Sequence, residues 1–429
     1  MNNELQQRLV ADVEETLNHT RWGDNISPRA FRTLYAGHNE HARLIIQATD
    51  PVVEESRFKA LLAAVRSLVA DFTHPETDRV GTGMTSVIGD AIFYPSGGQF
   101  EPTVEDLCRN LLRTAAVVGS PKAGRGLVDW FSGRPYVYHC RASVVGLTFE
   151  EAISTQGLHV SQLPRSVTEL QEAISTAWLR FSNDDDLLGK VMLSFDVAAT
   201  PPLYRPTGDE TPFDRPVARV PAFQGGWTDL CFALSLVTNH YVSWKYSWTD
   251  HGALYLLARE TGSGYSINEG VPFVCPEASL TKNTLEESLQ LCSRMKQVWN
   301  QELGIAVQRW HRSLRPGALA DRFIDLRIAL ESLYLSRGGG LKFRLALCGA
   351  WHLGRDEKER RQYYDLLTRA YGVASGAIHT GRINSPADRE TETLLSSAQD
   401  ACRKGLMKWI KEGRRPGGNT LELVLGGAE

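Results

Sequence analysis

His379 carries an imidazole, and two hydroxyl-bearing residues, Tyr371 and Ser375, precede it at steps of four residues in this 429-residue chain. An imidazole titrates near neutral pH and can act as a general acid or base. A neighbouring hydroxyl can orient it or contact a phosphate. A lone histidine at a helix end is, however, more often a capping or surface residue. The surrounding sequence must therefore decide between these two roles.

A second arrangement of possible ligands, His38 and His41, lies in the sequence Gly-His-Asn-Glu-His at 37–41. This spacing could serve a metal, but no second ligand cluster accompanies it. The seven cysteines are scattered without Cys-x-x-Cys spacing, and their odd number suits reduced, buried thiols. We therefore expect solvated surface histidines, no metal site, no cofactor and no disulfide bonds.

The region around His379 has a uniformly helical pattern, in which we predict five helices. The first begins at a capping box formed by Thr284 and Glu287 and keeps one apolar face as far as Trp310. The other four are predicted to begin near Asp321, Leu341, Asp356 and Ser385. Short connections imply antiparallel neighbours, so these helices should form a bundle. The tryptophans expected in its core are Trp299, Trp310 and Trp409.

Residues 1–280 begin with helical spacing of apolar residues and change texture near residue 126. Helices are predicted over 57–72 and 104–118. Later segments are short, rich in Val, Tyr, Phe and Leu, and bounded by Gly, Pro and Asp, which predicts strands. These segments are 136–149, 191–197, 230–237, 253–257 and 271–275.

The predicted fold class is therefore α+β with several domains, a mixed α/β amino-terminal part preceding an all-α bundle. A chain of this length exceeds the usual size of one hydrophobic core. The expected divisions are a mainly helical region at 1–120, a mixed α/β region at 121–280, the helical bundle at 281–415 and a tail at 416–429.

The bundle sequence resembles an Apea-like HEPN domain over about a third of the chain. Its most specific pieces are the helix DRFIDLRIALESLYL at 321–335 and the segment at 371–381. Family members read Tyr-x-x-Arg-Ser, three residues and then His-Gly in the second piece. The matching residues are Tyr371, Ser375, His379 and Gly381, with Thr380 displacing the glycine by one position. The resemblance implies a homodimeric helical bundle that cleaves RNA without a metal.

The resemblance also implies a role for each matching residue. His379 would transfer the proton, Ser375 would orient the imidazole or contact phosphate, and Tyr371 would bind substrate. RNA carries its own nucleophile, the ribose 2′-hydroxyl, so the protein needs proton transfer and positive charge at the phosphate. Further candidate substrate-binding residues are Arg327, Glu331 and Arg382.

The chain departs from the family at Ala374, which occupies the position of the motif arginine. In one account, Ala374 is an introduced substitution that disarms a toxic nuclease. In the other it is native, a small residue on the apolar stripe, and the domain serves as a binding scaffold. Arginines that could substitute are Arg344, Arg369 and Arg382, although Arg369 should lie on a different face from His379.

Charge is distributed unevenly along the chain. Residues 281–429 hold 24 Lys and Arg against 17 Asp and Glu, whereas residues 1–280 hold 23 against 33. A basic segment beside an acidic one suits a polyanion-binding domain attached to a part that does not bind polyanions, but chance clustering of solvated charge explains it equally. No apolar run is long enough to cross a bilayer and no secretory signal is present, so we expect a cytoplasmic protein that does not bind membranes.

With the resemblance, this pattern leads to the hypothesis of a bacterial ribonuclease effector in anti-phage defence, or a toxin. By analogy with proteins of this architecture, the amino-terminal half would sense a phage-derived trigger and restrain the HEPN dimer. The alternative is a non-catalytic HEPN pseudo-nuclease that binds RNA or assembles with partners. A weaker third hypothesis is a regulator that binds a small nucleotide in the same basic region.

Overall fold

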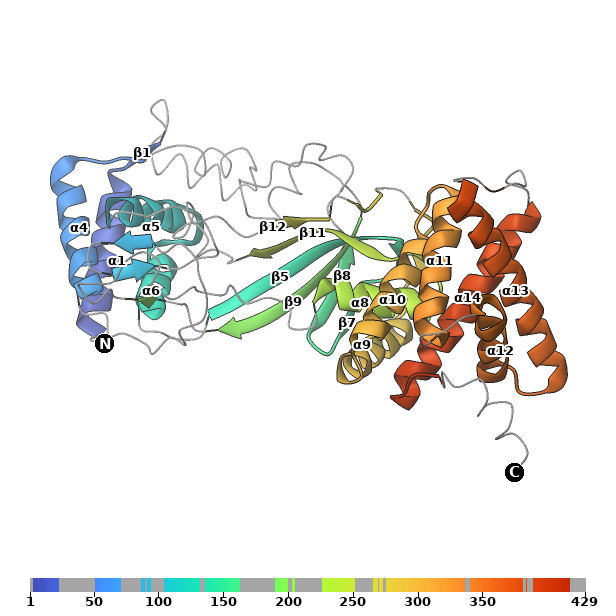
Figure 1. The fold of residues 1–429 in the computed structure, drawn as a ribbon. Coiled ribbons are helices and arrows are strands. Elements are labelled where there is room, and N and C mark those ends of the chain that lie inside the picture. The colour runs from blue at the N-terminus through green and yellow to red at the C-terminus, as the bar shows by residue number, and fades with distance from the viewer. Residues whose placement is uncertain are drawn as a thin grey trace, which may run out of the picture. The chain divides into compact units, whose positions relative to one another are not determined.

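The computed structural model describes residues 3–22, 51–70, 86–88, 91–93, 104–131, 136–162, 190–199, 203–204, 226–250, 265–268, 270–272, 275–335, 340–380, 383 and 389–416. These residues form an α+β protein (Figure 1). The chain divides into two compact units. The first contains Met1–Ser143, Gln156–Gln224 and Tyr246–Asn268, and the second contains Val144–Thr155, Gly225–Lys245 and Glu269–Glu429.

The first unit has a small helical core. Its helices are α1 (Asn3–Asn18), α4 (Glu55–Ala70), α5 (Val104–Val118) and α6 (Ser120–Phe131). Leu61, Leu68 and Leu111 are among its fully buried side chains, as the helical spacing of the apolar residues requires. Helices α4 and α5 confirm those predicted over 57–72 and 104–118. Short strands are β1 (Arg21–Trp22), β2 (Pro51–Val52), β3 (Ser86–Ile88), β4 (Ala91–Phe93) and β10 (Leu203–Tyr204).

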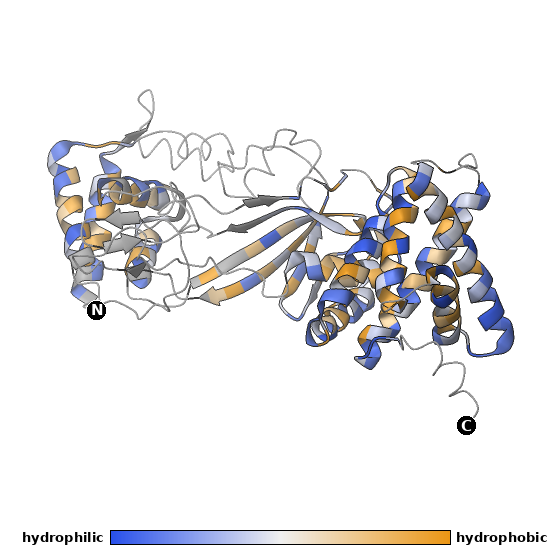
Figure 2. Cartoon of the chain, viewed as in Figure 1, coloured by the Kyte–Doolittle hydropathy of each residue, from blue (hydrophilic) through white to orange (hydrophobic). Residues whose placement is uncertain are grey.

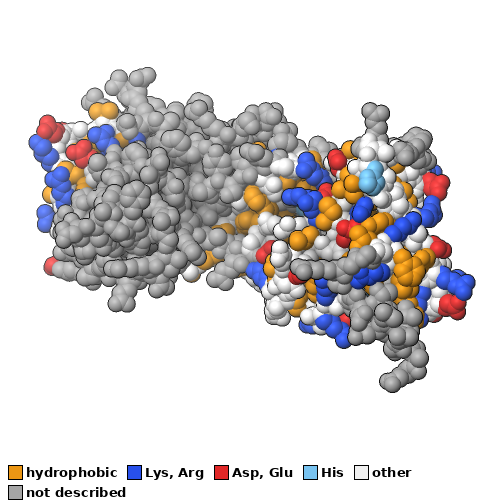
Figure 3. All heavy atoms as spheres, in the orientation of Figure 1, with side chains coloured by type: hydrophobic (Ala, Val, Ile, Leu, Met, Phe, Trp, Pro, Cys, Tyr) orange, Lys and Arg blue, Asp and Glu red, His pale blue; other side chains and the backbone are white. Residues whose placement is uncertain are grey.

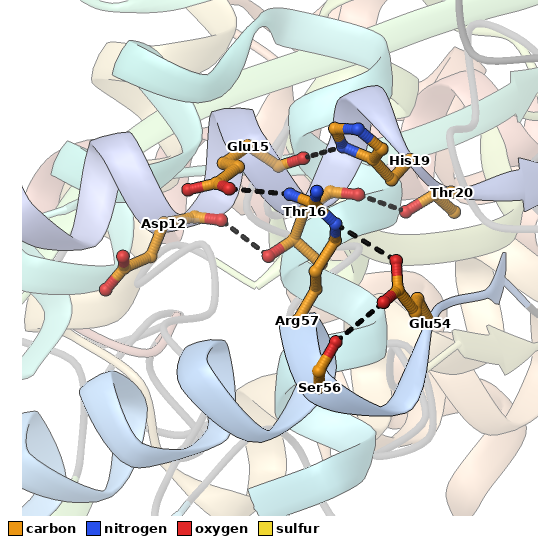
Figure 4. A network of polar contacts seen from close by, with 8 residues as sticks. All are labelled: Asp12, Glu15, Thr16, His19, Thr20, Glu54, Ser56 and Arg57. Atoms are coloured by element: carbon orange, nitrogen blue, oxygen red, sulfur yellow. Dashed lines mark hydrogen bonds and ion pairs between the residues drawn. The ribbon is translucent and has the colours of Figure 1, made fainter.

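Arg57 joins α4 to α1 by its ion pair with Glu15 and also pairs with Glu54, which directly precedes α4 (Figure 4). Its guanidinium donates to Glu15 Oε1 at 2.6 Å and to Glu54 Oε2 at 3.2 Å, and Ser56 Oγ donates to the other oxygen of Glu54 at 2.8 Å. The two carboxylates are largely exposed, so water screens their attraction to Arg57 and these pairs contribute little to stability.

A six-stranded sheet has the strand order β12-β11-β5-β9-β8-β7. Its strands are β5 (Tyr136–Val145), β7 (Ile153–Thr155), β8 (Leu158–Gln162), β9 (Val191–Ala199), β11 (Ser243–Asp250) and β12 (Tyr265–Ile267). Strands β8 and β9 pair antiparallel, with Leu158 opposite Phe195. Elsewhere β6 (Leu147–Thr148) pairs in parallel with β13 (Ala278–Ser279). Strands β5, β6 and β9 confirm the β structure expected in 136–149 and 191–197.

The strand predicted over 230–237 is wrong, because this segment lies in helix α8 (Trp227–Thr238). Residues 230–236 are all buried, so the helix is apolar on every side and shows no helical period. The described residues of 271–275 form no strand, and 253–257 lies outside the described residues.

The second unit holds the six carboxy-terminal helices. They are α9 (Lys282–Gln297), α10 (Gln301–Leu314), α11 (Leu319–Tyr334), α12 (Leu341–Leu353), α13 (Glu357–Thr380) and α14 (Arg389–Glu412). Helix α11 packs against α10, α13 and α14, and α12 packs against α13 (Figure 1). Hydrophobic and hydrophilic residues alternate around the helices, as amphipathic packing requires (Figure 2).

The first predicted helix of this region is two helices. Helix α9 begins one turn earlier than expected, where Thr281 Oγ1 accepts the amide of Thr284 at 3.2 Å. A second cap interrupts the predicted helix, because Asn300 Oδ1 accepts the amide of Leu303 at 2.8 Å and starts α10. Trp299, in the break, is 39% exposed, which makes its predicted core position wrong, whereas Trp310 and Trp409 are buried.

The helical core also includes residues that precede the carboxy-terminal helices. Phe232, Ala233 and Leu236 of α8 belong to the same buried cluster as Trp310 and Trp409. Arg403 of α14 donates to the carbonyl of Leu236 at 3.1 Å. The compact helical unit is thus built from more of the chain than residues 281–415. Over the part of the chain that is described, no helix combines the length and the apolar composition needed to cross a membrane.

Candidate active site

Helix α13 carries most of the candidate residues, and its buried residues lie between Leu367 and Ala377, before an exposed last turn. The helix begins where Asp356 Oδ1 accepts the amide of Glu359 at 2.8 Å, which confirms the predicted cap. Further along, Tyr371 is 7% exposed, Ser375 is half-buried and His379 is exposed in the last turn.

Three predicted residues come together between α11 and α13. The phenol of Tyr371 donates to Glu331 Oε1 at 3.0 Å, and the Nε of Arg327 donates to the same oxygen at 2.7 Å. The Arg327 guanidinium carbon lies 4.3 Å from the centre of the Tyr371 ring, which is a cation–π contact. Burial and the negative charge of Glu331 raise the pKa of Tyr371. The phenol therefore stays protonated and can donate its hydrogen bond.

Ser375 and His379 follow Tyr371 at successive steps of four residues. A step of four is slightly more than one helical turn, so these residues lie on neighbouring parts of one side of α13. The next residue before His379, Ile378, is 45% exposed. On the face shown in Figure 3, hydrophobic side chains reach the surface of the helical unit among Lys and Arg side chains. The imidazole is thus accessible beside an apolar side chain.

Ala374 lies in the core instead of on this exposed surface. It is 1% exposed and belongs to the cluster that contains Leu367 and Ala370. An arginine side chain at this position would begin inside the core, and its guanidinium would have to extend past core residues to reach solvent. Of the arginines considered as substitutes, Arg369 pairs with Glu390 at 2.8 Å and Arg344 is half-buried. Arg382, like Gly381, lies outside the described residues.

Lys342 is a cation near this surface that the sequence did not identify. Its Nζ lies 3.7 Å from the position that a Cβ on Gly372 would occupy. Apart from the adjoining part of α13, no atom of the described residues lies within 4 Å of the corresponding position at Gly376. Two glycines four residues apart on α13 were the available sequence signal, because they leave the backbone open to close approach.

Neither a search for metal-ligand groups nor comparison with known proteins assigns a role to these residues. Within the described ranges no group of three or more His, Cys, Asp or Glu side chains could hold a metal ion. His38 and His41 lie outside those ranges. No protein-family model, curated protein or solved structure matches this chain.

Proposed function

We propose that this chain is a metal-independent endoribonuclease of the HEPN kind, acting in bacterial anti-phage defence or as a toxin. The observation that supports this best is the cluster of Arg327, Glu331 and Tyr371, with the exposed His379 about two turns further along α13. Residues selected from the two family-like segments come from two helices and meet at Tyr371, on the helix that also carries His379. A shared location is what a substrate-binding site requires.

In the proposed reaction, the 2′-oxygen of RNA attacks the adjacent phosphorus and the bond to the 5′-oxygen breaks. His379 takes the 2′-proton, and the partner's His379 gives a proton to the leaving 5′-oxygen. The products are a 2′,3′-cyclic phosphate and a 5′-hydroxyl. Arg327 stabilises the phosphoryl oxygens, while Glu331 and Tyr371 hold its guanidinium in place.

A homodimer is part of this proposal, because one imidazole cannot carry out both proton transfers in a single step. Ile378 supports it as a residue that a second copy would cover, since 45% of this large apolar side chain is exposed next to His379. Residues 1–280, whose charges are mainly acidic, are proposed to sense a phage-derived trigger and to restrain the dimer.

Ala374 should make the reaction slow. Removing one well-placed stabiliser of transition-state charge commonly lowers the rate by about 100- to 1000-fold. The test is Ala374→Arg, assayed for RNA cleavage with and without EDTA, for the chemistry of the product ends and for toxicity on induction. We expect faster cleavage that resists EDTA and disappears in Ala374→Arg combined with His379→Ala. An Ala374→Arg protein that folds, cuts no RNA and is harmless on induction would contradict the proposal.

The burial of Ala374 favours a second function, a non-catalytic HEPN module that binds RNA or assembles with partners. A native small residue suits the core position, whereas an arginine there must cross the core to reach solvent. This function predicts RNA affinity that falls with salt and survives His379→Ala unchanged. Cleavage by the unaltered chain would exclude it.

A further inference from the structure

We infer that Lys342 binds the phosphate backbone of RNA on the side of α13 that ends at His379. This inference rests on the proposed function and assigns a substrate-binding cation that the motif does not contain. It starts from the position of the ammonium group, 3.7 Å from where a Gly372 side chain would begin. Because Gly372 has no side chain, the cation from α12 can lie against the surface of α13.

Lys342 and His379 face the same stretch of this surface. His379 follows Gly372 by seven residues, which is almost two full turns and about 10.5 Å along the helix axis. Helical side chains tilt toward the amino terminus, so the imidazole leans back toward Gly372 and shortens this separation. A single RNA strand lying along α13 can therefore contact both groups.

The surface between them is open. Gly376 lies between Gly372 and His379, and among the described residues no atom beyond the adjoining part of α13 lies within 4 Å of where its Cβ would be. A phosphate or ribose can approach the helix backbone there more closely than it could approach a residue with a side chain.

The charge of Lys342 is also available for a ligand. Its side chain is exposed, and no carboxylate of the described residues lies within ion-pair distance of it. Arg369, by contrast, is paired with Glu390 at 2.8 Å. An ammonium is a compact point charge that binds phosphate without the fixed geometry a guanidinium needs.

The charge of Lys342 matters because residue 374 is an alanine. The residue in the motif-arginine position is buried and uncharged, so it brings no charge to the phosphate. Lys342 reaches the exposed side of α13 from a different helix.

The experiment uses the 429-residue chain and measures its binding to a fluorescent single-stranded RNA of mixed sequence by anisotropy at several salt concentrations. We expect Lys342→Ala to weaken binding about 10-fold and to reduce the slope of log affinity against log salt by about one phosphate contact. Lys342→Arg should keep most of the affinity. The matched control is Lys358→Ala, which removes an exposed lysine from the first turn of α13 and should change neither quantity.

A second variant tests the geometry without removing the charge. Gly372→Met would place a long side chain where the ammonium lies and should weaken binding as Lys342→Ala does. If the unaltered chain binds RNA and Lys342→Ala binds as tightly as Lys358→Ala, this inference is overturned while the proposed function stands. If neither the unaltered chain nor Ala374→Arg binds or cuts RNA, the proposed function fails and the inference fails with it.

Discussion

The phenol of Tyr371 donates a 3.0 Å hydrogen bond to the carboxylate of Glu331, forty positions earlier in the chain. This bond connects α13 to α11 at the point where Arg327 also meets the carboxylate. Two residues of the candidate site are thus held by a contact that also stabilises the bundle, and its structural and functional effects can be measured separately.

Tyr371→Phe removes this hydrogen bond and keeps the ring that lies under Arg327. We expect the free energy of unfolding to fall by about 1 kcal/mol, the usual net contribution of one partly buried hydrogen bond. Urea denaturation measures the change. Tyr364→Phe is the control, because Tyr364 lies on the same helix and only its ring contact with Phe343 is described. Equal stability of the two variants would show that the bond contributes nothing.

Ala374→Arg should lower stability as well as supply the motif charge. The position is enclosed by the core, so the longer side chain must displace neighbours and bring a charge through apolar surroundings. We expect a loss of about 3 kcal/mol in the free energy of unfolding, from the general cost of overpacking and of burying a charge. Ser375→Arg, at the adjacent half-buried position, should cost less. If Ala374→Arg is as stable as the unaltered chain, the guanidinium reaches solvent without disturbing the core.

Stability should fall as the pH is lowered, because His311 is buried as a neutral imidazole. Its Nε2 donates to the carbonyl of Val242 at 2.8 Å, and its ring stacks on Tyr241 with 4.6 Å between ring centres. Burial lowers the pKa of His311 from 6.5 to about 4. Between about pH 6.5 and pH 4, His311 is therefore protonated in the unfolded chain and neutral in the folded chain. The free energy of unfolding decreases as the pH falls through this window.

The measurement is the free energy of unfolding at pH 7 and at pH 4.5 for the unaltered chain and for His311→Gln. A shift of this size corresponds to a loss of about 3 kcal/mol once the pH is below both pKa values. His311→Gln cannot titrate and can still donate to Val242, so its stability should depend less on pH. The same pH dependence in both proteins would contradict this assignment. His352, whose pKa burial also lowers to about 4, supplies part of the dependence that remains.

Two glycines of the bundle should respond to alanine in opposite directions. At Gly376 a Cβ would meet no atom of another described element within 4 Å, so Gly376→Ala should stabilise the helix by up to about 1 kcal/mol through helix propensity. At Gly405 a Cβ would lie 2.5 Å from the Tyr334 hydroxyl and 2.8 Å from a Leu333 methyl. Gly405→Ala should therefore destabilise the protein, and thermal unfolding of the two variants compares them directly. Stabilisation by Gly405→Ala would show that α11 and α14 do not approach so closely.

The sequence predicted the amphipathic elements well because their apolar spacing is a local property. Helix α5 has the bounds predicted for it, 104–118, and α13 begins at the predicted cap. The buried helix α8 was mistaken for a strand, because a short apolar run without a polar side has no period to read. The break before α10 was missed because the apolar spacing continues through Asn300, while the cap depends on one side chain turning back to the backbone.

For the candidate site too, the sequence identified single residues, whereas the contacts between them depend on helix packing. The resemblance selected Tyr371, Glu331 and Arg327 individually, but their shared hydrogen bonds depend on how α11 packs against α13. The position of Lys342 against Gly372 depends on the packing of α12, and no periodicity within either helix encodes it. Contacts between distant residues therefore had to come from the structure.

The discontinuous composition of the helical unit sets the order in which it can be completed during translation. Segments Val144–Thr155 and Gly225–Lys245 leave the ribosome well before α14, so Phe232 and Leu236 must wait for the last helix before their core closes. A nascent chain cannot display a finished α13 surface until α14 has been synthesised. A fragment starting at residue 281 would lack α8, so the apolar surface of α9–α14 that packs against α8 would be exposed to water. Expression of this fragment should therefore yield aggregation-prone protein.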